Sequence, residues 1–458
     1  MNRTLRSPFC AALAACLLTG CAAPMSQTVQ TVKTAGAPAA RSTEDPVIMS
    51  HIAESYVKLV LAVGQHDSDY VDAYYGPPEW KQQAAAGKRA LAEIRGEATA
   101  LLADLHAHPP VAGKTGRDAE ILHLRHEYLT RQIESMVARI DLLAGEKMSF
   151  DQESKALYDT VAPTYGESHF QGIVAELETQ LPGSGSLTDR LDAFRKTYVI
   201  PRDRLGRVFD AAIAECRRRT AEHIQLPAGE SFVVEYVTDK PWSGYNWYKG
   251  GYHSVIQVNT DLPIFIDRAV DLACHEGYPG HHVYNSLLEQ QMVKARGWPE
   301  FSIYPLFSPQ SLIAEGTANF GIEVAFPGPD RVAYEKKILF PLAGLDPATA
   351  DRYYRVQELT QKLSYAGNEA ARRYLDGTIS REQAVDWLMR YALTPRDRSE
   401  QRVRFIERYR SYVINYNFGQ DLVKEYVEKH GGTADYPEER WRVFTALISS
   451  PRLPSGLR

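Results

Sequence analysis

Apolar side chains recur at helical spacing through most of the chain from Pro46 onward. On the first helical face these side chains are Ile52, Tyr56, Leu59, Val60 and Val63. The same periodicity predicts helices at about 86–106, 117–144, 151–160, 167–180 and 187–225, the last of them broken at Pro201. The first half of the chain is therefore expected to be α-helical.

The pattern changes near residue 227, where short β-branched and aromatic runs replace the helical periodicity. Residues 232–237 and 252–259 are predicted to be strands, separated by an aromatic, glycine-rich loop at 242–251. One interpretation places these strands at a cleft edge, where a peptide adds as an extra strand and Gly250-Gly251 leaves room for its backbone. The alternative is a simple hairpin that has no role in substrate binding.

The segment 275–282 reads His-Glu-Gly-Tyr-Pro-Gly-His-His and carries three imidazoles and one carboxylate. Neutral imidazoles bind zinc, and a carboxylate beside the metal can take a proton from bound water, which makes Glu276 the expected general base. His281 and His282 follow His275 by six and seven residues, whereas an H-E-x-x-H helix spaces its histidines by four. Since proline kinks a helix and glycine frees the backbone, we interpret the motif as a helix with a Pro-Gly bulge. His281 is then the expected partner of His275, and His282 is a supporting residue or the alternative ligand.

A further helix is predicted at 312–320, and it carries the candidate third ligand. Glu315 would complete the set begun by the two histidines and leave the fourth zinc position to water. Asn319 lies one turn later on the same face, where its amide could hydrogen-bond a ligand histidine. Glu323 is the rival ligand, and a surface acid is its alternative interpretation.

The motif resembles that of a bacterial family of largely uncharacterised proteins. His-Glu-x-x-Pro-Gly-His-His, followed by Glu315-Gly316 in a later helix, is similar to the pattern of this family, which is grouped with the zincin-like, gluzincin-type metallopeptidases. The resemblance extends over most of the chain and includes Asp-Ala-Tyr-Tyr-Gly-Pro at 72–77. It implies a zincin-like peptidase with one zinc ion and does not define a substrate. The family usually has an aromatic residue after Glu-Gly, whereas this chain has Thr317 there. The difference affects the expected wall of the pocket and not the metal ligands.

Peptide hydrolysis also needs a donor for the developing oxyanion. The C-terminal third of the chain offers Tyr365, Arg408, Arg410, Tyr412 and Tyr416. Tyr412 and Tyr365 are taken as the catalytic candidates. The stretch that begins at Tyr365, Tyr-Ala-Gly, is also similar to the late helices of the family.

Two other groups of residues have side chains that can bind metals. His123 and His126 lie three residues apart on the predicted helix 117–144, and a polar stripe on a long helix explains them without a metal. Cys216 and Cys274 are the cysteines that remain once the leader and the expected lipidated Cys21 are set aside, and one disulfide between them would be compatible with an oxidising compartment. A buried structural thiol is the preferred interpretation of Cys274.

The first residues indicate the compartment of the protein, and the composition excludes nucleic acid as a partner. With 44% hydrophobic residues, 24% charged residues and a net charge of −5, the 458-residue chain is globular and has no basic surface for nucleic acid. Residues 1–20 combine two arginines with an apolar run and end before Cys21 in Leu-Thr-Gly-Cys, which resembles a bacterial lipobox. An ordinary secretory leader is the alternative. Ala22 favours the periplasmic face of the outer membrane, and the lipid anchor is the expected membrane contact.

Together these features predict a mainly α, zincin-like metallopeptidase with a short β-sheet beside the metal helix. The expected organisation is a signal peptide (1–20), a lipidated cysteine and flexible tether (21–45), an N-terminal helical lobe (46–226) and a metal-binding catalytic lobe (227–458), with a cleft between the lobes. The expected activity is zinc-dependent hydrolysis of short peptides, and no oligomeric state is predicted. The alternatives are a non-catalytic binding or scaffold lipoprotein and a zinc amidase acting on cell-wall peptides.

Overall fold

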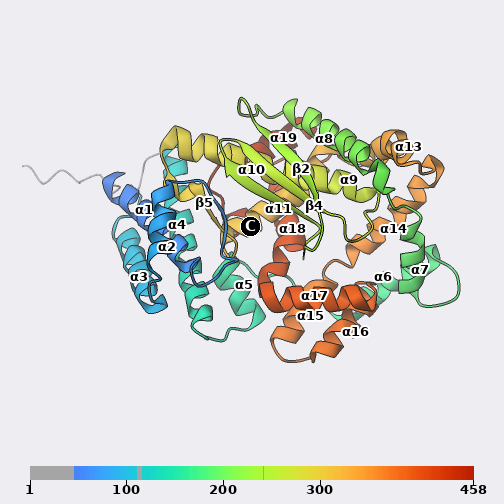
Figure 1. Cartoon of the computed structure of the whole chain (residues 1–458), viewed down its shortest axis with the longest axis horizontal. Coiled ribbons are helices and arrows are strands. Elements are labelled where there is room, and N and C mark those ends of the chain that lie inside the picture. Colours follow the sequence, from blue (N-terminus) through green and yellow to red (C-terminus); the bar gives the residue numbers. More distant parts are fainter. Residues whose placement is uncertain (1–45, 111–115, 241) are drawn as a thin grey trace, which may run out of the picture. The chain divides into compact units, whose positions relative to one another are not determined.

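The computed structural model of the chain describes residues 46–458 except 111–115 and 241. The described residues are mainly helical, as the apolar spacing predicted, and contain two small sheets (Figure 1). The predicted leader, the tether and Cys21 lie outside the described residues. Within the described part, no helix combines the length and the apolar character that crossing a bilayer requires. The division into lobes at residue 226 stays a prediction.

The N-terminal helices predicted from the apolar spacing are confirmed, with boundaries that differ by a few residues, and a short helix at 78–86 was not predicted. They are α1 (Pro46–Val63), α2 (Pro78–Ala86), α3 (Leu91–Ala107), α4 (Arg117–Leu143), α5 (Phe150–Tyr158), α6 (Glu167–Gln180), α7 (Leu187–Lys196) and α8 (Leu205–Ala221). Helix α5 begins with a capping box, in which Ser149 and Gln152 satisfy each other's backbone N–H groups. The break near Pro201 separates α7 from α8 because proline lacks the N–H that a continuous helix needs.

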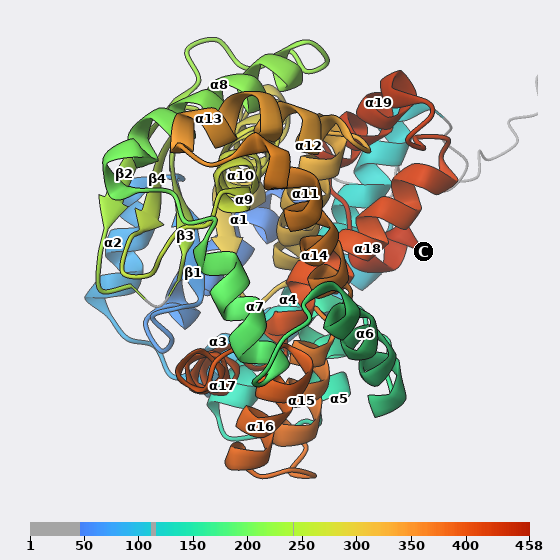
Figure 2. The same cartoon turned by 90° about the vertical axis from the view of Figure 1, so that its right-hand side faces the viewer.

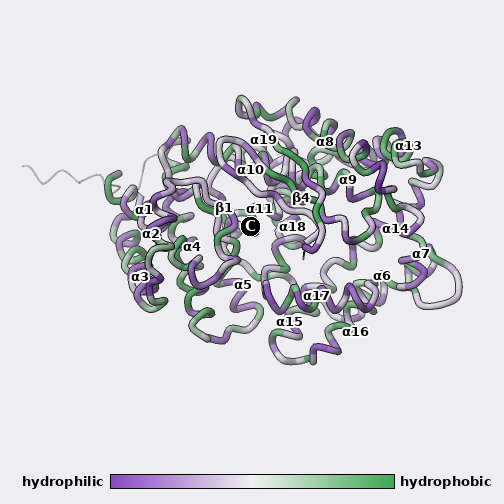
Figure 3. The backbone as a smooth tube through the Cα atoms, viewed as in Figure 1, coloured by the Kyte–Doolittle hydropathy of each residue, from purple (hydrophilic) through white to green (hydrophobic). Residues whose placement is uncertain are grey.

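The C-terminal part is also helical, and its helices are shorter. They are α9 (Asp267–Leu272), α10 (His281–Leu288), α11 (Pro309–Ala325), α12 (Asp330–Tyr334), α13 (Phe340–Ala343), α14 (Ala350–Lys362), α15 (Ala366–Leu375), α16 (Arg381–Tyr391), α17 (Arg396–Tyr409), α18 (Ile414–Lys429) and α19 (Pro437–Ile448). Along most helices the tube in Figure 3 alternates between hydrophobic and hydrophilic residues, which is the pattern of helices with one buried face.

The larger sheet has the strand order β2-β4-β3. Strand β4 (His253–Asn259) is central, pairing in parallel with β2 (Ser231–Val237) and antiparallel with β3 (Gly244–Gly250). The two predicted strands are confirmed, but the predicted loop at 242–251 is wrong because most of it forms β3. The cleft-edge interpretation is also wrong for 252–259, since both edges of a central strand are already paired.

A second, two-stranded sheet was not predicted. Strand β1 (Val71–Tyr74) pairs antiparallel with β5 (Ile303–Pro305), so a segment near the start of the domain lies against the chain just before α11. Tyr75, directly after β1, occupies the space beside Gly250, where an added Cβ would lie 2.7 Å from the Tyr75 Cβ. The sequence had suggested that this space is open to a substrate backbone. The Tyr75 side chain fills it instead.

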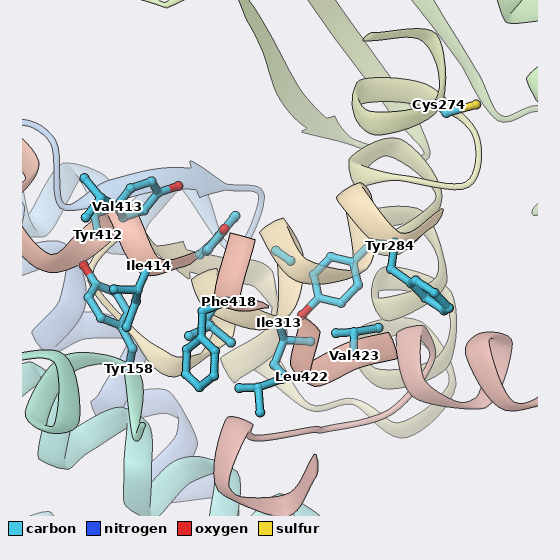
Figure 4. Close-up of a cluster of buried hydrophobic side chains, with 14 of the residues drawn as sticks. Tyr158, Cys274, Tyr284, Ile313, Tyr412, Val413, Ile414, Phe418, Leu422 and Val423 are labelled. Carbon is cyan, nitrogen blue, oxygen red and sulfur yellow. The ribbon is translucent and has the colours of Figure 1, made fainter. Parts of the chain in front are cut away.

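Helices α11 and α18 cross at the centre of the molecule, where they lie side by side (Figure 1). Their shared core contains Ile313 from α11 and Phe418, Leu422 and Val423 from α18, all buried (Figure 4). Burying each such side chain contributes about 1.5–3 kcal/mol. At Gly316 the backbones are so close that an added Cβ would lie 2.5 Å from the carbonyl carbon on α18 that faces it.

The two cysteines form a disulfide that joins α8 to the segment following α9. Cys216 and Cys274 are both fully buried, and 58 residues separate them in the sequence. The preferred interpretation of Cys274 as a free buried thiol is therefore wrong. The sequence named this pair as a possible disulfide but could not show that the bond forms, because two cysteines carry no framework signal.

Candidate metal centre

The His-Glu motif spans the end of one helix and the start of another. After α9 the chain forms a π-helical turn at Ala273–Gly277, which carries His275 and Glu276, and α10 begins at His281. The prediction of one bulged helix is thus wrong: the helix stops and a second one starts. At Gly280 an added Cβ would collide with the backbone carbonyl of His275, so only glycine allows the two helix ends to approach this closely.

Three candidate ligand atoms converge from these helix ends and from α11. The Nε2 atoms of His275 and His281 are 3.2 Å apart, and the Glu315 Oε2 lies 3.4 Å from the first and 3.8 Å from the second. With bonds of about 2.0–2.1 Å, tetrahedral zinc holds neighbouring ligand atoms about 3.3 Å apart. The Oε2 atom is buried and has no hydrogen-bond partner among the described residues. This donor set therefore fits a zinc ion.

Hydrogen bonds from the neighbouring helices fix the orientation of these ligands. The Asn319 Nδ2 donates to the backbone oxygen of Tyr416 at 3.0 Å, so its Oδ1 is left to accept from the His275 Nδ1 at 3.0 Å. This bond places the imidazole proton on Nδ1 and leaves the Nε2 lone pair facing the ligand cluster. The other oxygen of Glu315 accepts from the Tyr412 hydroxyl at 2.8 Å.

His282 lies outside this cluster, although it follows His281 directly. Its Nδ1 is 2.9 Å from the Ser254 hydroxyl and its Nε2 is 3.0 Å from the Glu230 Oε2. Both ring nitrogens are therefore engaged elsewhere. Although burial opposes the charge on Glu230, hydrogen bonds from His282, Tyr278 and Arg217 together lower its pKa. His282 thus supports the fold beneath the cluster and does not join the ligand atoms.

The electrostatics of the site are dominated by buried carboxylates. Burial opposes the charge of Glu315, but His275 and His281 outweigh it and hold its pKa well below the usual range. Burial likewise opposes protonation of His281, yet Glu315, Glu276 and Asp72 raise its pKa to about 9. In the protein without metal, His281 is therefore charged at neutral pH.

Asp72 is a residue of the site that the motif analysis missed. It lies on β1 and accepts a hydrogen bond from the Tyr245 hydroxyl on β3. Burial raises its pKa to about 7, which the charge of His281 opposes and the carboxylates of Glu315 and Glu276 reinforce. The available signal was the Asp-Ala-Tyr-Tyr-Gly-Pro segment, which had been used for the resemblance and not for the chemistry.

Glu276 is buried, with 5% of its surface exposed, and lies against β3. Asn246 donates from its Nδ2 to the backbone oxygen of Glu276 at 2.7 Å. A Cβ added at Gly244 would lie 3.1 Å from the Glu276 Oε1, so glycine lets the β3 backbone pack closely against this carboxylate. The Tyr416 hydroxyl interacts electrostatically with both Glu276 and Glu315, so it belongs to the same site.

The remaining predicted candidates have other partners. The Tyr365 hydroxyl donates to Asp421 at 2.5 Å, which commits it away from the three ligand atoms. Glu323 accepts from Gln420 and Lys424, as its interpretation as a surface acid predicts. The two arginines considered as oxyanion donors form ion pairs, Arg408 with Asp69 and Arg410 with Glu153.

His123 and His126, the other histidine pair singled out from the sequence, have partners of their own on and beside α4. The His126 Nε2 lies 2.9 Å from the backbone oxygen of Leu105, and His123 lies beside Glu127 on the exposed face of α4. Within residues 46–458, apart from the segments left out, His275, His281 and Glu315 form the one group of three potential ligands.

No family model and no curated protein sequence matches this chain. Among solved structures, one similar to it is a candidate lipoprotein from Colwellia psychrerythraea, with 16% identity over 80% of this chain and 68% of that chain and a TM-score of 0.50. A Pyrococcus furiosus carboxypeptidase has 12% identity over 91% of this chain and 94% of its own, with a TM-score of 0.46. A candidate lipoprotein of unknown function from Shewanella oneidensis has 13% identity, coverage of 81% and 76%, and a TM-score of 0.41. At these identities the Colwellia structure indicates a shared fold alone.

Proposed function

We propose that this protein is a zinc-dependent peptidase whose metal is held by His275, His281 and Glu315. The observation that carries the proposal is the convergence of two imidazole Nε2 atoms and one carboxylate oxygen without a hydrogen bond at the spacing of tetrahedral ligands. The zincin-like family that the motif resembles supports the same assignment.

The residues around the ligands have the chemistry that peptide hydrolysis needs. Bound zinc would supply an acidified water and polarise the carbonyl of the substrate. Glu276 follows the first ligand directly, and its carboxylate takes the proton of the attacking water and passes it to the leaving amine. Burial raises the pKa of both Tyr412 and Tyr416, so both hydroxyls keep their protons. The Tyr412 proton is donated to Glu315, which leaves the Tyr416 hydroxyl as the donor to the oxyanion.

We place the protein at the periplasmic face of the outer membrane as part of the same proposal. The support is the leader pattern that ends at Cys21, together with the candidate lipoprotein from Colwellia psychrerythraea that shares its fold. A buried disulfide is also stable in an oxidising compartment. Labelling of the expressed protein with a radioactive fatty acid tests this, and Cys21→Ser is expected to abolish the label.

The decisive experiment separates metal binding from catalysis. Purified protein is expected to contain one zinc per chain, and Glu276→Gln should keep the zinc while losing hydrolysis of a mixed peptide library. Glu315→Gln should lose the zinc, whereas Glu323→Gln on the same helix α11 is the matched control that keeps both zinc and activity. Unchanged hydrolysis by Glu276→Gln would reject the mechanism.

The same samples discriminate the alternatives. A binding or scaffold protein need hold no stoichiometric zinc, so a wild-type protein free of zinc after purification with the metal supplied would favour that class. Cleavage of muropeptides without cleavage of free peptides would identify an amidase that acts on cell-wall peptides. Restoration of peptide hydrolysis by zinc after removal with a chelator supports the peptidase.

A further inference from the structure

A cavity of about 350 Å³ lies beside the candidate metal centre. Helix α7, the chain that leads into α9, and the start of α17 form its walls, and Figure 2 shows α7 beside α17, which is seen along its axis. Its volume is in the range of small-molecule sites.

The cavity and the metal centre share a wall. Ser243 and Leu272 line the cavity, and Gly244 directly follows Ser243. A Cβ added at Gly244 would lie 2.6 Å from the Leu272 Cδ2 and 3.1 Å from the Glu276 Oε1. One backbone segment of β3 therefore separates the cavity from the carboxylate of the proposed general base.

The charges in the cavity wall are mainly positive. Arg195, Arg268 and Arg398 line it, and the one acid in the wall, Asp192, is paired with Lys196 at 2.6 Å. Arg268 has its own acidic neighbour on α9. Arg195 and Arg398 have no acidic partner among the residues that the structure describes, and the Arg195 Nε is buried without a hydrogen-bond partner there. A buried donor left unpaired costs about 1–3 kcal/mol, so this wall is complementary to an anion.

A further arginine links this wall to the metal centre. Arg402 lies one turn after Arg398 on α17, so the two side chains share one face of the helix. It is half-buried and forms no ion pair or hydrogen bond within the described part of the chain. Its electrostatic neighbour is Tyr416, which also interacts with Glu315 and Glu276. Arg402 therefore extends the positive charge of α17 from the cavity wall to the neighbourhood of Tyr416.

We propose that this cavity binds a carboxylate of the peptide substrate through Arg195 and Arg398, with Arg402 directing it toward the metal centre. Guanidinium groups bind carboxylates in a bidentate, planar geometry, which fixes orientation as well as charge. The proposal rests on the proposed peptidase function, and it names the substrate class: peptides with an anionic group close to the scissile bond. That group is either the C-terminal carboxylate or an acidic side chain.

Binding is measured by calorimetry on zinc-loaded protein carrying Glu276→Gln, so that nothing is turned over. A peptide acid is compared with its C-terminal amide, and a peptide amide containing Glu is compared with its Gln counterpart. At least one carboxylate is expected to tighten binding about tenfold or more, as a charged hydrogen bond does. A difference in the first pair identifies the C-terminus, and a difference in the second identifies a side chain.

Arginine variants in the same background locate the effect. Arg398→Gln and Arg402→Gln should each reduce the carboxylate preference, and Arg398→Lys should restore part of it because the charge remains. Arg404→Gln is the matched control, since Arg404 is exposed on α17 and lies outside the cavity wall. Equal binding of all peptide pairs would overturn the proposal, as would an equal loss in Arg404→Gln. Failure of the wild-type protein to hydrolyse any peptide would instead refute the peptidase function, independently of these binding data.

Discussion

The contact between α11 and α18 at Gly316 offers a direct test of how the fold positions the metal ligands. Gly316→Ala places a methyl carbon 2.5 Å from the carbonyl carbon of Gly419. Ordinary carbon–carbon contacts are about 3.5–4.0 Å, so the helices must separate by about 1 Å. Overpacking of this kind costs about 1–3 kcal/mol.

The separation also acts on the candidate metal centre. The hydrogen bonds from Tyr412 to Glu315, at 2.8 Å, and from Asn319 to Tyr416, at 3.0 Å, join α11 to α18 and the turn before it. An increase of about 1 Å carries both beyond hydrogen-bonding distance. Loss of such supporting bonds typically lowers metal affinity about 10–100-fold, and we expect that range for Gly316→Ala.

Equilibrium urea unfolding and competition with a zinc chelator measure the two effects. The matched control is Gly172→Ala on α6, where an added Cβ meets nothing within 4 Å. That change should stabilise the protein by up to about 1 kcal/mol, because alanine is the better helix former. If Gly316→Ala retained wild-type stability and zinc affinity, close packing of the two helices would not be what positions Glu315.

Four further expectations concern the site and its support. Zinc binding near neutral pH should release about one proton, because the pKa of His281 is about 9 without metal and a ligand imidazole must be neutral. Calorimetry in buffers of different ionisation enthalpy measures the number of protons released. The affinity for zinc should accordingly rise with pH up to about 9. Asn319→Ala should weaken zinc binding about 10–100-fold in a chelator competition, because the His275 Nδ1 loses its acceptor. Replacing Cys216 and Cys274 by alanine should lower the free energy of unfolding by about 4 kcal/mol in non-reducing urea titrations, from the 58-residue loop that the bond closes.

The helices could be predicted because their periodicity is a local property of the sequence. Helix α6 spans the residues expected for it, and β2 and β4 fall where β-branched residues cluster. Strand β3 was mistaken for a loop because it begins and ends with glycine, although its Asn246 and Tyr248 alternate inward. Its pairing with β4 stabilises a segment whose own composition is typical of a turn.

The composition of the site depends on contacts that no local pattern contains. The spacing in the motif identified His275, Glu276 and His281, and a helical pattern identified Glu315. Asp72 joins them only because β1 lies beside β3, and its bond to Tyr245 connects residues 173 positions apart. The choice between His281 and its neighbour likewise required the backbone break before α10, which aims the two imidazoles at different partners.

The balance of charge in the site is itself an argument for a divalent cation. Glu315, Glu276 and Asp72 surround two imidazoles, and without a metal the fold compensates them with one proton on His281. Between one and two negative charges then remain in a largely buried space, since the pKa of Asp72 is about 7, and uncompensated buried charge costs several kcal/mol. A dication that displaces this proton compensates the carboxylates more fully than the proton does. The same reasoning separates this centre from the arginine-lined cavity beside it, whose positive charge is complementary to an anion and not to a metal.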